Sequence, residues 1–177
     1  MNFRLNKFLI FSFTLSLFNI LSQSCVTDDE PGNSGLTVGD SLPSFSVTLN
    51  DGTKISDKSL EGKVGVIVFF NTSCPDCQEE LPVVQQLWEK LHGSSDVEII
   101  AISREEDAGS VSEYWADKGL SIPWSAQSDR KVYSLFASSG IPRIYISDRS
   151  GIITSAFSDN PLPSLDDLIS AVAIALN

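Results

Sequence analysis

Two cysteines separated by two residues are the part of this sequence best suited to chemistry. Cys74-Pro75-Asp76-Cys77 follows an apolar run and opens a segment with helical periodicity. Two thiols at this spacing can close a small disulfide ring and so exchange two electrons with a partner. The first thiol stands at the expected start of a helix, where backbone N–H groups and the helix dipole favour a thiolate. The motif therefore predicts a redox-active dithiol.

Two other uses of the cysteine pair have to be weighed. Zinc would need two further ligands, and beyond the pair the chain offers Cys25 and its one histidine, His92. A purely structural disulfide would close a ring too small to restrain the unfolded chain much. Redox use is favoured over both. We therefore expect no metal and no cofactor, and we expect His92 to be a surface or helix-capping residue.

The residues around the pair predict an α/β domain. Residues 64–70 form a continuous apolar run, typical of a buried parallel strand. Residues 75–91 carry apolar side chains at helical spacing, which predicts a helix with one buried face. Similar patterns predict further strands at 97–103, 122–125, 142–147 and 152–157, and helical segments at 108–118, 129–136 and 165–176, the last with Ser164 as N-cap.

A β-hairpin is expected at the N-terminal end of this domain. Residues 42–49 alternate as a half-buried strand does, residues 50–53 carry an Asp-Gly turn signal, and a short strand and loop follow in 54–60. The sum is a central mixed sheet, flanked by helices on both faces, with an N-terminal β-hairpin extension.

The first 35 residues differ in composition from the rest. Residues 1–24 combine a basic start, Arg4 and Lys7, with an uncharged apolar stretch, as an export signal does. A small residue then precedes the lone Cys25, which resembles a bacterial lipoprotein box and implies a lipid on Cys25; an ordinary cleaved signal is the alternative. Residues 25–35 are typical of a flexible tether, and residues 36–177 should form the folded domain. We expect a lipid anchor in the bacterial cell envelope, facing the periplasm or exposed on the outer membrane.

The overall charge narrows the range of partners. The chain holds 12 basic and 23 acidic residues, a formal net charge of −11. An acidic surface argues against nucleic acid as a partner.

Several motifs in a fixed order carry more information than the cysteine pair alone. They are Val38-Gly39-Asp40, Pro43-Ser44-Phe45, Gly62-Lys63, Cys74 to Cys77, Glu80-Leu81-Pro82, Gly140-Ile141-Pro142 and Asp148 to Gly151. Together they resemble the thioredoxin superfamily, most closely its membrane-tethered TlpA/ResA-like branch of the AhpC/TSA redoxin type, over residues 36–176. The resemblance implies a thioredoxin fold and a thiol-disulfide oxidoreductase that is a lipoprotein.

The resemblance also implies a role for each site residue. Cys74 would be the exposed attacking thiol and Cys77 the buried resolving thiol. Pro142 would be a cis-proline facing the pair, and Ile141 would offer its backbone to a substrate strand. Glu80, one turn after Cys77, would move protons as the thiols change state; an ordinary exposed glutamate is the alternative. The partners would be protein disulfides and a membrane thiol-disulfide electron donor.

Acidic residues near the pair suggest a direction for the reaction. Asp76, Glu79 and Glu80 lie close in sequence to the thiols, and residues 64–86 contain no Lys or Arg. Nearby negative charges disfavour a thiolate, so we expect a reductant or isomerase and not a strong oxidant.

Two rival functions remain. A redoxin-type peroxidase would need Thr or Ser three residues before its cysteine and Pro seven before, where this chain has Asn71 and Ile67. A surface-anchored binding module could use the groove at Ile141 and Pro142 without needing both thiols.

Overall fold

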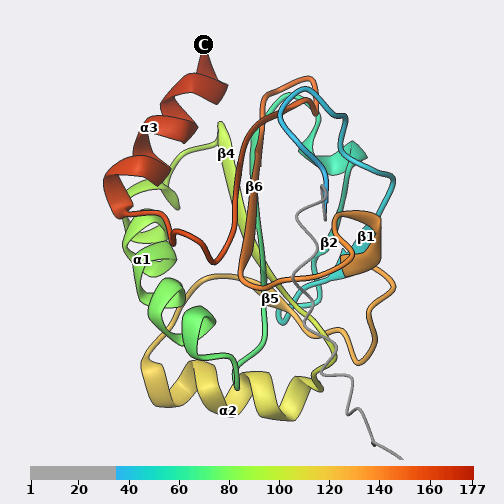
Figure 1. Ribbon diagram of the computed structural model, residues 1–177, viewed down its shortest axis with the longest axis vertical. Helices are drawn as coiled ribbons and strands as arrows, with labels where there is room; N and C mark the ends of the chain where they lie inside the picture. The colour runs from blue at the N-terminus through green and yellow to red at the C-terminus, as the bar shows by residue number, and fades with distance from the viewer. Residues whose placement is uncertain (1–34) are drawn as a thin grey trace, which may run out of the picture. The chain divides into compact units, whose positions relative to one another are not determined.

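The computed structural model describes residues 35–177 (Figure 1). The expected export signal, Cys25 and nearly all of the expected tether lie outside the described residues. No helix within the described part is both long and apolar enough to cross a membrane. The elements, in chain order, are β1 (Ser46–Thr48), β2 (Lys54–Ser56), η1 (Lys58–Leu60), β3 (Val64–Phe70), α1 (Pro75–Leu91), β4 (Val97–Ser103), α2 (Ala108–Lys118), β5 (Trp124–Ser125), η2 (Tyr133–Leu135), β6 (Arg143–Ser147), β7 (Ile153–Phe157) and α3 (Leu165–Leu176).

A five-stranded mixed sheet is the centre of the structure. Its strand order is β5-β4-β3-β6-β7, and β3 pairs in parallel with β4 and antiparallel with β6. All seven residues of β3 are buried, because this strand has neighbours on both sides and layers on both faces. The apolar run that precedes the cysteines is thus the middle strand of the sheet, as the sequence predicts.

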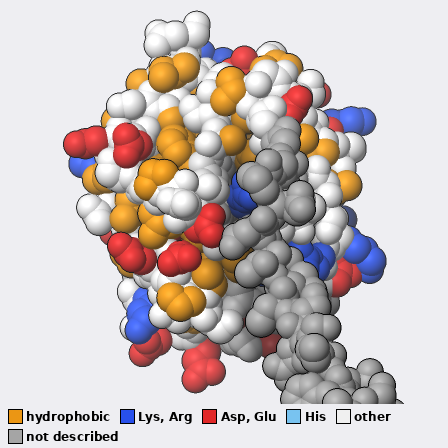
Figure 2. Space-filling model, in the orientation of Figure 1, with side chains coloured by type: hydrophobic (Ala, Val, Ile, Leu, Met, Phe, Trp, Pro, Cys, Tyr) orange, Lys and Arg blue, Asp and Glu red, His pale blue; other side chains and the backbone are white. Residues whose placement is uncertain are grey.

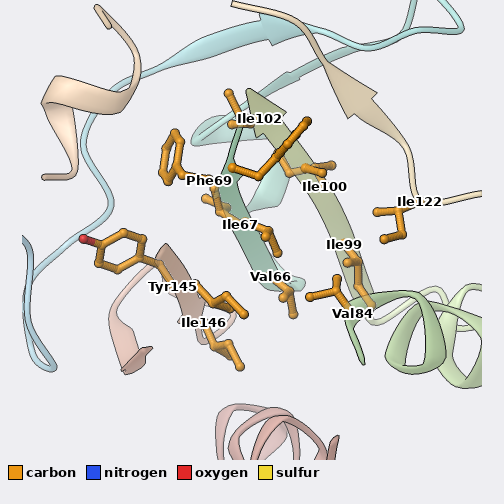
Figure 3. Packing of buried hydrophobic residues seen from close by; sticks show 14 of the residues in the cluster. Val66, Ile67, Phe69, Val84, Ile99, Ile100, Ile102, Ile122, Tyr145 and Ile146 are labelled. Carbon is orange, nitrogen blue, oxygen red and sulfur yellow. The ribbon is translucent and has the colours of Figure 1, made fainter. Parts of the chain in front are cut away.

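The three α-helices of residues 35–177 all lie on one face of the sheet. The chain passes from β3 through α1 to β4 and through α2 to β5, always in the same direction across the sheet. Right-handed crossovers in one direction put both connecting helices on one face. Accordingly Val66 points toward Val84 of α1 (Figure 3), and Phe70, on the same face of β3, packs against Trp115 of α2 at 4.9 Å between ring centroids. Helix α3 contacts α1 and joins the same layer.

On the opposite face, the described part of the chain places no α-helix. Phe69 points to this face and makes ring contacts with Tyr133 of η2 and with Phe136. Phe45, just before β1, packs on Phe136 in turn. Figure 1 shows the β1–β2 hairpin on this side of the sheet. The expected mixed sheet with flanking helices and an N-terminal hairpin is confirmed, but the expectation of helices on both faces is wrong for the α-helices.

The N-terminus of α3 and the C-terminus of α1 are capped as the sequence indicates. Ser164 caps α3 in a capping box with Asp167. His92 is the C-cap residue of α1, its ring stacked on Trp88 at 4.4 Å between centroids. The prediction that His92 is a capping residue is confirmed.

Charged side chains are spread over the surface. Figure 2 shows acidic side chains scattered across the visible face, with basic and hydrophobic ones between them. This distribution is typical of a solvated acidic surface.

Candidate active site

The two cysteines lie just after β3, the middle strand of the sheet, where helix α1 begins. Cys74 is the N-cap residue of α1, in extended conformation, and Pro75 takes the first helical position, where a missing N–H costs nothing. Cys77 lies in the first turn and is fully buried, whereas Cys74 is half-buried. Both thiols are free. Cys77 is buried as expected, and Cys74, which was expected to be exposed, is exposed only in part.

Hydrogen bonds that involve the side chains of Asn71 and Glu106 hold the loop between β3 and Cys74. The Asn71 carboxamide accepts a hydrogen bond from the Ser73 N–H at 2.9 Å and donates to the Arg104 carbonyl oxygen at 3.0 Å. The Thr72 N–H donates to the Glu106 carboxylate at 3.0 Å, and its hydroxyl binds the same group. The polar side chains of residues 71–73 therefore attach the loop that leads to Cys74 to the segment that follows β4.

The loop before β6 comes directly against Cys74, although the two are 67 residues apart. The Ile141–Pro142 peptide bond is cis, which confirms the geometry expected for Pro142. The Cys74 thiol donates to the Ile141 carbonyl oxygen, with Sγ and O 3.6 Å apart. The structure thus brings together Cys74, Ile141 and Pro142, three residues singled out from the sequence.

Glu80 is buried, and not an ordinary exposed glutamate. Its side chain lies one turn after Cys77 in α1, on the face of the helix that packs on the sheet, and the residue is 1% exposed. Neither carboxyl oxygen has a hydrogen-bond partner among the described residues. Burial disfavours the carboxylate and the charge of Glu79 adds to this, so the pKa of Glu80 is raised to about 7. Such a group can gain or lose a proton near neutral pH.

Burial also governs the resolving thiol. The pKa of Cys77 is raised strongly, above all because its thiolate would be desolvated. A backbone hydrogen bond at Asn71 and the positive charge of Arg104 act in the opposite direction, and the proximity of Cys74 adds to the rise. Cys77 is therefore held as a neutral thiol and needs a base before it can attack.

Arg104 is a residue of the site that the sequence analysis missed. It follows β4 directly, and Ser103 at the end of β4 pairs with Phe70 at the end of β3. The carboxyl ends of neighbouring parallel strands lie at one edge of a sheet, so Arg104 sits beside the segment that leads to the cysteines. Its guanidinium lies over the ring of Tyr133, 5.1 Å from the centroid. The pairing register of β3 with β4 is the feature that would have indicated Arg104.

A zinc site built from the pair and His92 does not fit the structure. His92 caps the far end of α1, 15 residues after Cys77, a rise of roughly 22 Å along a helix. Among residues 35–177, no group of three or more His, Cys, Asp or Glu side chains is placed to hold a metal ion. Cys25, the other candidate ligand, lies outside the described residues.

The fold and the site together define a thioredoxin-like α/β domain with a dithiol at the start of its first helix. The chain belongs to the AhpC/TSA family, whose match covers residues 38–156. It is 29% identical, over 116 residues, to the thiol-disulfide oxidoreductase ResA of Bacillus thuringiensis (strain Al Hakam), an alignment that covers 66% of each chain, just under two thirds of the relative's length.

Solved structures agree with the fold. One is the solution structure of a proposed protein disulfide isomerase from Bacteroides thetaiotaomicron, with a TM-score of 0.71 and 27% identity over 78% of this chain and 87% of that one. Another is a thiol:disulfide interchange protein of the thioredoxin family from Chlorobium tepidum TLS, with a TM-score of 0.68 and 26% identity over 80% of this chain and 99% of that one.

Proposed function

We propose that this protein is a thiol-disulfide oxidoreductase that reduces protein disulfides in the cell envelope through the Cys74–Cys77 couple. The observation that carries the proposal is the contact of the Cys74 thiol with the Ile141 carbonyl oxygen, beside a cis-proline and above a buried second thiol. This contact places the sulfur beside the backbone of Ile141, the segment proposed to meet a substrate strand. The similarity to ResA supports the same class of reaction.

The proposed reaction balances as two successive thiol–disulfide exchanges. The Cys74 thiolate attacks one sulfur of the substrate disulfide; that S–S bond breaks, and the released substrate sulfur takes up a proton. Cys77 then loses its proton and attacks the Cys74 sulfur, so that the Cys74–Cys77 bond forms and the second substrate sulfur leaves and is protonated. Two electrons and the two thiol protons end on the substrate. An outside thiol donor must then return the pair to its reduced form.

Glu80 is the base proposed for the second exchange, in which Cys77 attacks the Cys74 sulfur. It lies one turn from Cys77 on the same helix, and its pKa of about 7 lets it accept a proton near neutral pH. The resolving thiol cannot ionise readily by itself, because burial raises its pKa. As the Cys77 proton leaves, Glu80 is the buried group on the same helix suited to take it, and it then passes the proton to the departing substrate sulfur or to water.

Location and partners complete the proposal. The sequence of residues 1–35 supports a lipid anchor on Cys25, and a protein held at a membrane in this way is suited to a membrane thiol-disulfide electron donor. Protein disulfides are the proposed substrates. A reducing direction is favoured by the high pKa of Cys77, because a dithiol whose reduced form is not stabilised as a thiolate gives up its electrons more readily.

Insulin reduction tests the proposal. The full-length chain with Cys25→Ser would be used, so that Cys74 and Cys77 are its two remaining thiols. We expect turnover with dithiothreitol as donor, none with Cys74→Ser, and a reduction potential in the lower half of the range from about −270 to −120 mV. Absence of turnover with a fully reduced pair would reject the activity, whereas a potential near the upper end would reject only the reducing direction. Rapid peroxide consumption would favour the peroxidase instead.

A further inference from the structure

The loop that carries Ile141 is held by side chains at four consecutive backbone carbonyls. Each carbonyl oxygen from residue 138 to residue 141 accepts a hydrogen bond from a side chain that lies elsewhere in the chain or just beyond the loop. The pairs are Arg130 Nη2 to Ser138 O at 2.8 Å, Arg143 Nη2 to Ser139 O at 2.9 Å, Tyr133 Oη to Gly140 O at 2.6 Å and Cys74 Sγ to Ile141 O at 3.6 Å. Loop backbone that lacks such partners is usually satisfied by water and moves more freely.

Tyr133 is the fixed centre of this arrangement. Its side chain is 1% exposed and packs edge-on against Phe69, at 5.5 Å between ring centroids. The guanidinium carbons of Arg104 and Arg130 lie 5.1 and 5.6 Å from the centroid of its ring. Cations over a tyrosine ring are attracted to its face, so both arginines help to hold the ring in place. The hydroxyl that reaches Gly140 is therefore set by packing and not by the loop itself.

The side chain of Arg143 fits closely against the loop. Gly140 has a φ of +79°, and a Cβ at this position would meet Arg143 Nη2 at 3.2 Å. Only glycine takes this conformation readily while leaving room for the guanidinium. The fit of Arg143 against Gly140 and the hydrogen bond to Ser139 keep the turn before the cis-proline in one shape.

We propose that Arg130, Tyr133 and Arg143 form a positioning clamp that holds the Ile141 backbone edge ready to receive a peptide strand of the substrate. This inference rests on the proposed thiol-disulfide exchange with proteins and adds the residues that determine how protein substrates bind. A preformed edge spares the substrate the entropy of ordering the loop. The clamp should therefore matter for disulfides embedded in a polypeptide and little for a small disulfide that makes no backbone contact.

Two buried tyrosines offer a matched pair of variants. Tyr133→Phe keeps the ring between the arginines and removes the hydroxyl that binds Gly140 O. Tyr145→Phe removes a hydroxyl from the same aromatic cluster, but that hydroxyl binds Phe136 O, at 3.1 Å, outside the loop. Both lose one buried hydrogen bond, so a general loss of stability affects both alike.

The test compares two substrates with the full-length chain carrying Cys25→Ser. For insulin we expect Tyr133→Phe to raise KM roughly fivefold, the equivalent of one neutral hydrogen bond, with kcat nearly unchanged. The KM for an aromatic non-peptide disulfide and the reduction potential of the pair should stay as in the parent protein, and Tyr145→Phe should leave all of these values unchanged. The clamp would be overturned if the two tyrosine variants had equal effects, if Tyr133→Phe affected both substrates equally, or if Tyr133→Phe changed nothing. In each case, insulin turnover by the parent protein would still support the proposed function.

A second measurement checks the clamp without any turnover. Amide hydrogen exchange in residues 138–142 should be faster in Tyr133→Phe than in the parent or in Tyr145→Phe. Unchanged exchange there would show that the loop is held without the tyrosine and would overturn the proposal. A parent protein that reduced neither substrate would instead reject the proposed function, and the substrate role of the clamp with it.

Discussion

Replacing Glu80 with glutamine should make the folded protein more stable above neutral pH. The substitution keeps the size of the side chain and removes its charge. Glu80 is 1% exposed, and its two carboxyl oxygens have no hydrogen-bond partner within the described part of the chain. A carboxylate in such surroundings is costly, which is why the pKa of Glu80 is raised from 4.5 to about 7.

The sign and size of the effect follow from proton binding. Between pH 4.5 and 7 the folded protein keeps a proton on Glu80 that the unfolded chain has lost, so the free energy of unfolding falls as the pH rises through this window. The 2.5-unit difference, at about 1.4 kcal/mol per pH unit, gives a loss of about 3.5 kcal/mol, nearly complete by about pH 8. Carboxyl groups whose pKa is lowered, such as Asp107, titrate below this window and do not oppose the trend.

Urea unfolding of the reduced full-length chain at pH 5, 6, 7 and 8 measures this effect. The parent protein should lose about 2.5 kcal/mol across the series, and Glu80→Gln should lose little and exceed the parent's stability at pH 8 by about 3 kcal/mol. Glu113→Gln is the matched control, because Glu113 is an exposed glutamate on α2 and its loss should leave the slope unchanged. A Glu80→Gln protein that keeps the parent's slope, or that is less stable at pH 8, would refute the reasoning.

Three further outcomes are expected. Cys77→Ser should accumulate a mixed disulfide between Cys74 and insulin, seen by mass spectrometry of the unreduced protein; its absence would count against Cys74 as the attacking thiol. Arg104→Gln should raise the pKa of Cys77 further and slow release of reduced substrate at pH 7, with Arg104→Lys restoring most of the rate; stopped-flow resolution at several pH values checks this, and identical pH profiles would contradict it. Ser164→Ala should lower the free energy of unfolding by about 1 kcal/mol in chemical denaturation, because it breaks the capping box of α3, and a loss under about 0.3 kcal/mol would contradict that reason.

Long periodic segments could be predicted from the sequence with their bounds, and the strands at 142–147 and 152–157 to within one residue, but the first strand of the hairpin could not. The predicted ranges 64–70, 75–91, 97–103, 108–118 and 165–176 coincide with β3, α1, β4, α2 and α3. The predicted strand at 42–49 shrinks to Ser46–Thr48, because its first residues bond elsewhere: Leu42 N–H to Gly151 O at 2.8 Å and Phe45 N–H to the Asp57 carboxylate at 3.2 Å. Alternation of side chains says where a strand can lie, and partners distant in sequence decide how much of it pairs.

The residues of the site also divide into those that the local sequence could predict and those that it could not. Cys74, Cys77 and Glu80 lie within one turn or two of a single helix, so spacing alone brings them together. Ile141 and Pro142 could be placed only through the family resemblance. Arg104, Tyr133 and their contacts depend on the pairing of β3 with β4 and on the packing of η2 beneath the sheet, neither of which any local pattern carries.

The electrostatics of the thiols show why neighbours in sequence are a poor guide to neighbours in space. The acidic residues Asp76 and Glu79 are exposed, where water and salt screen their charge, and the main cause of the raised pKa of Cys77 is burial. The cation that acts on Cys77 comes from Arg104, 27 residues away in sequence and outside the stretch counted as free of Lys and Arg. The proposal of a reducing couple therefore rests on the burial of Cys77 and not on the acidic residues near it in sequence. A neutral, buried Cys77 stabilises no thiolate in the reduced protein. In the proposed mechanism, the charge of Arg104 limits this effect, so that the thiol can ionise when Glu80 takes its proton.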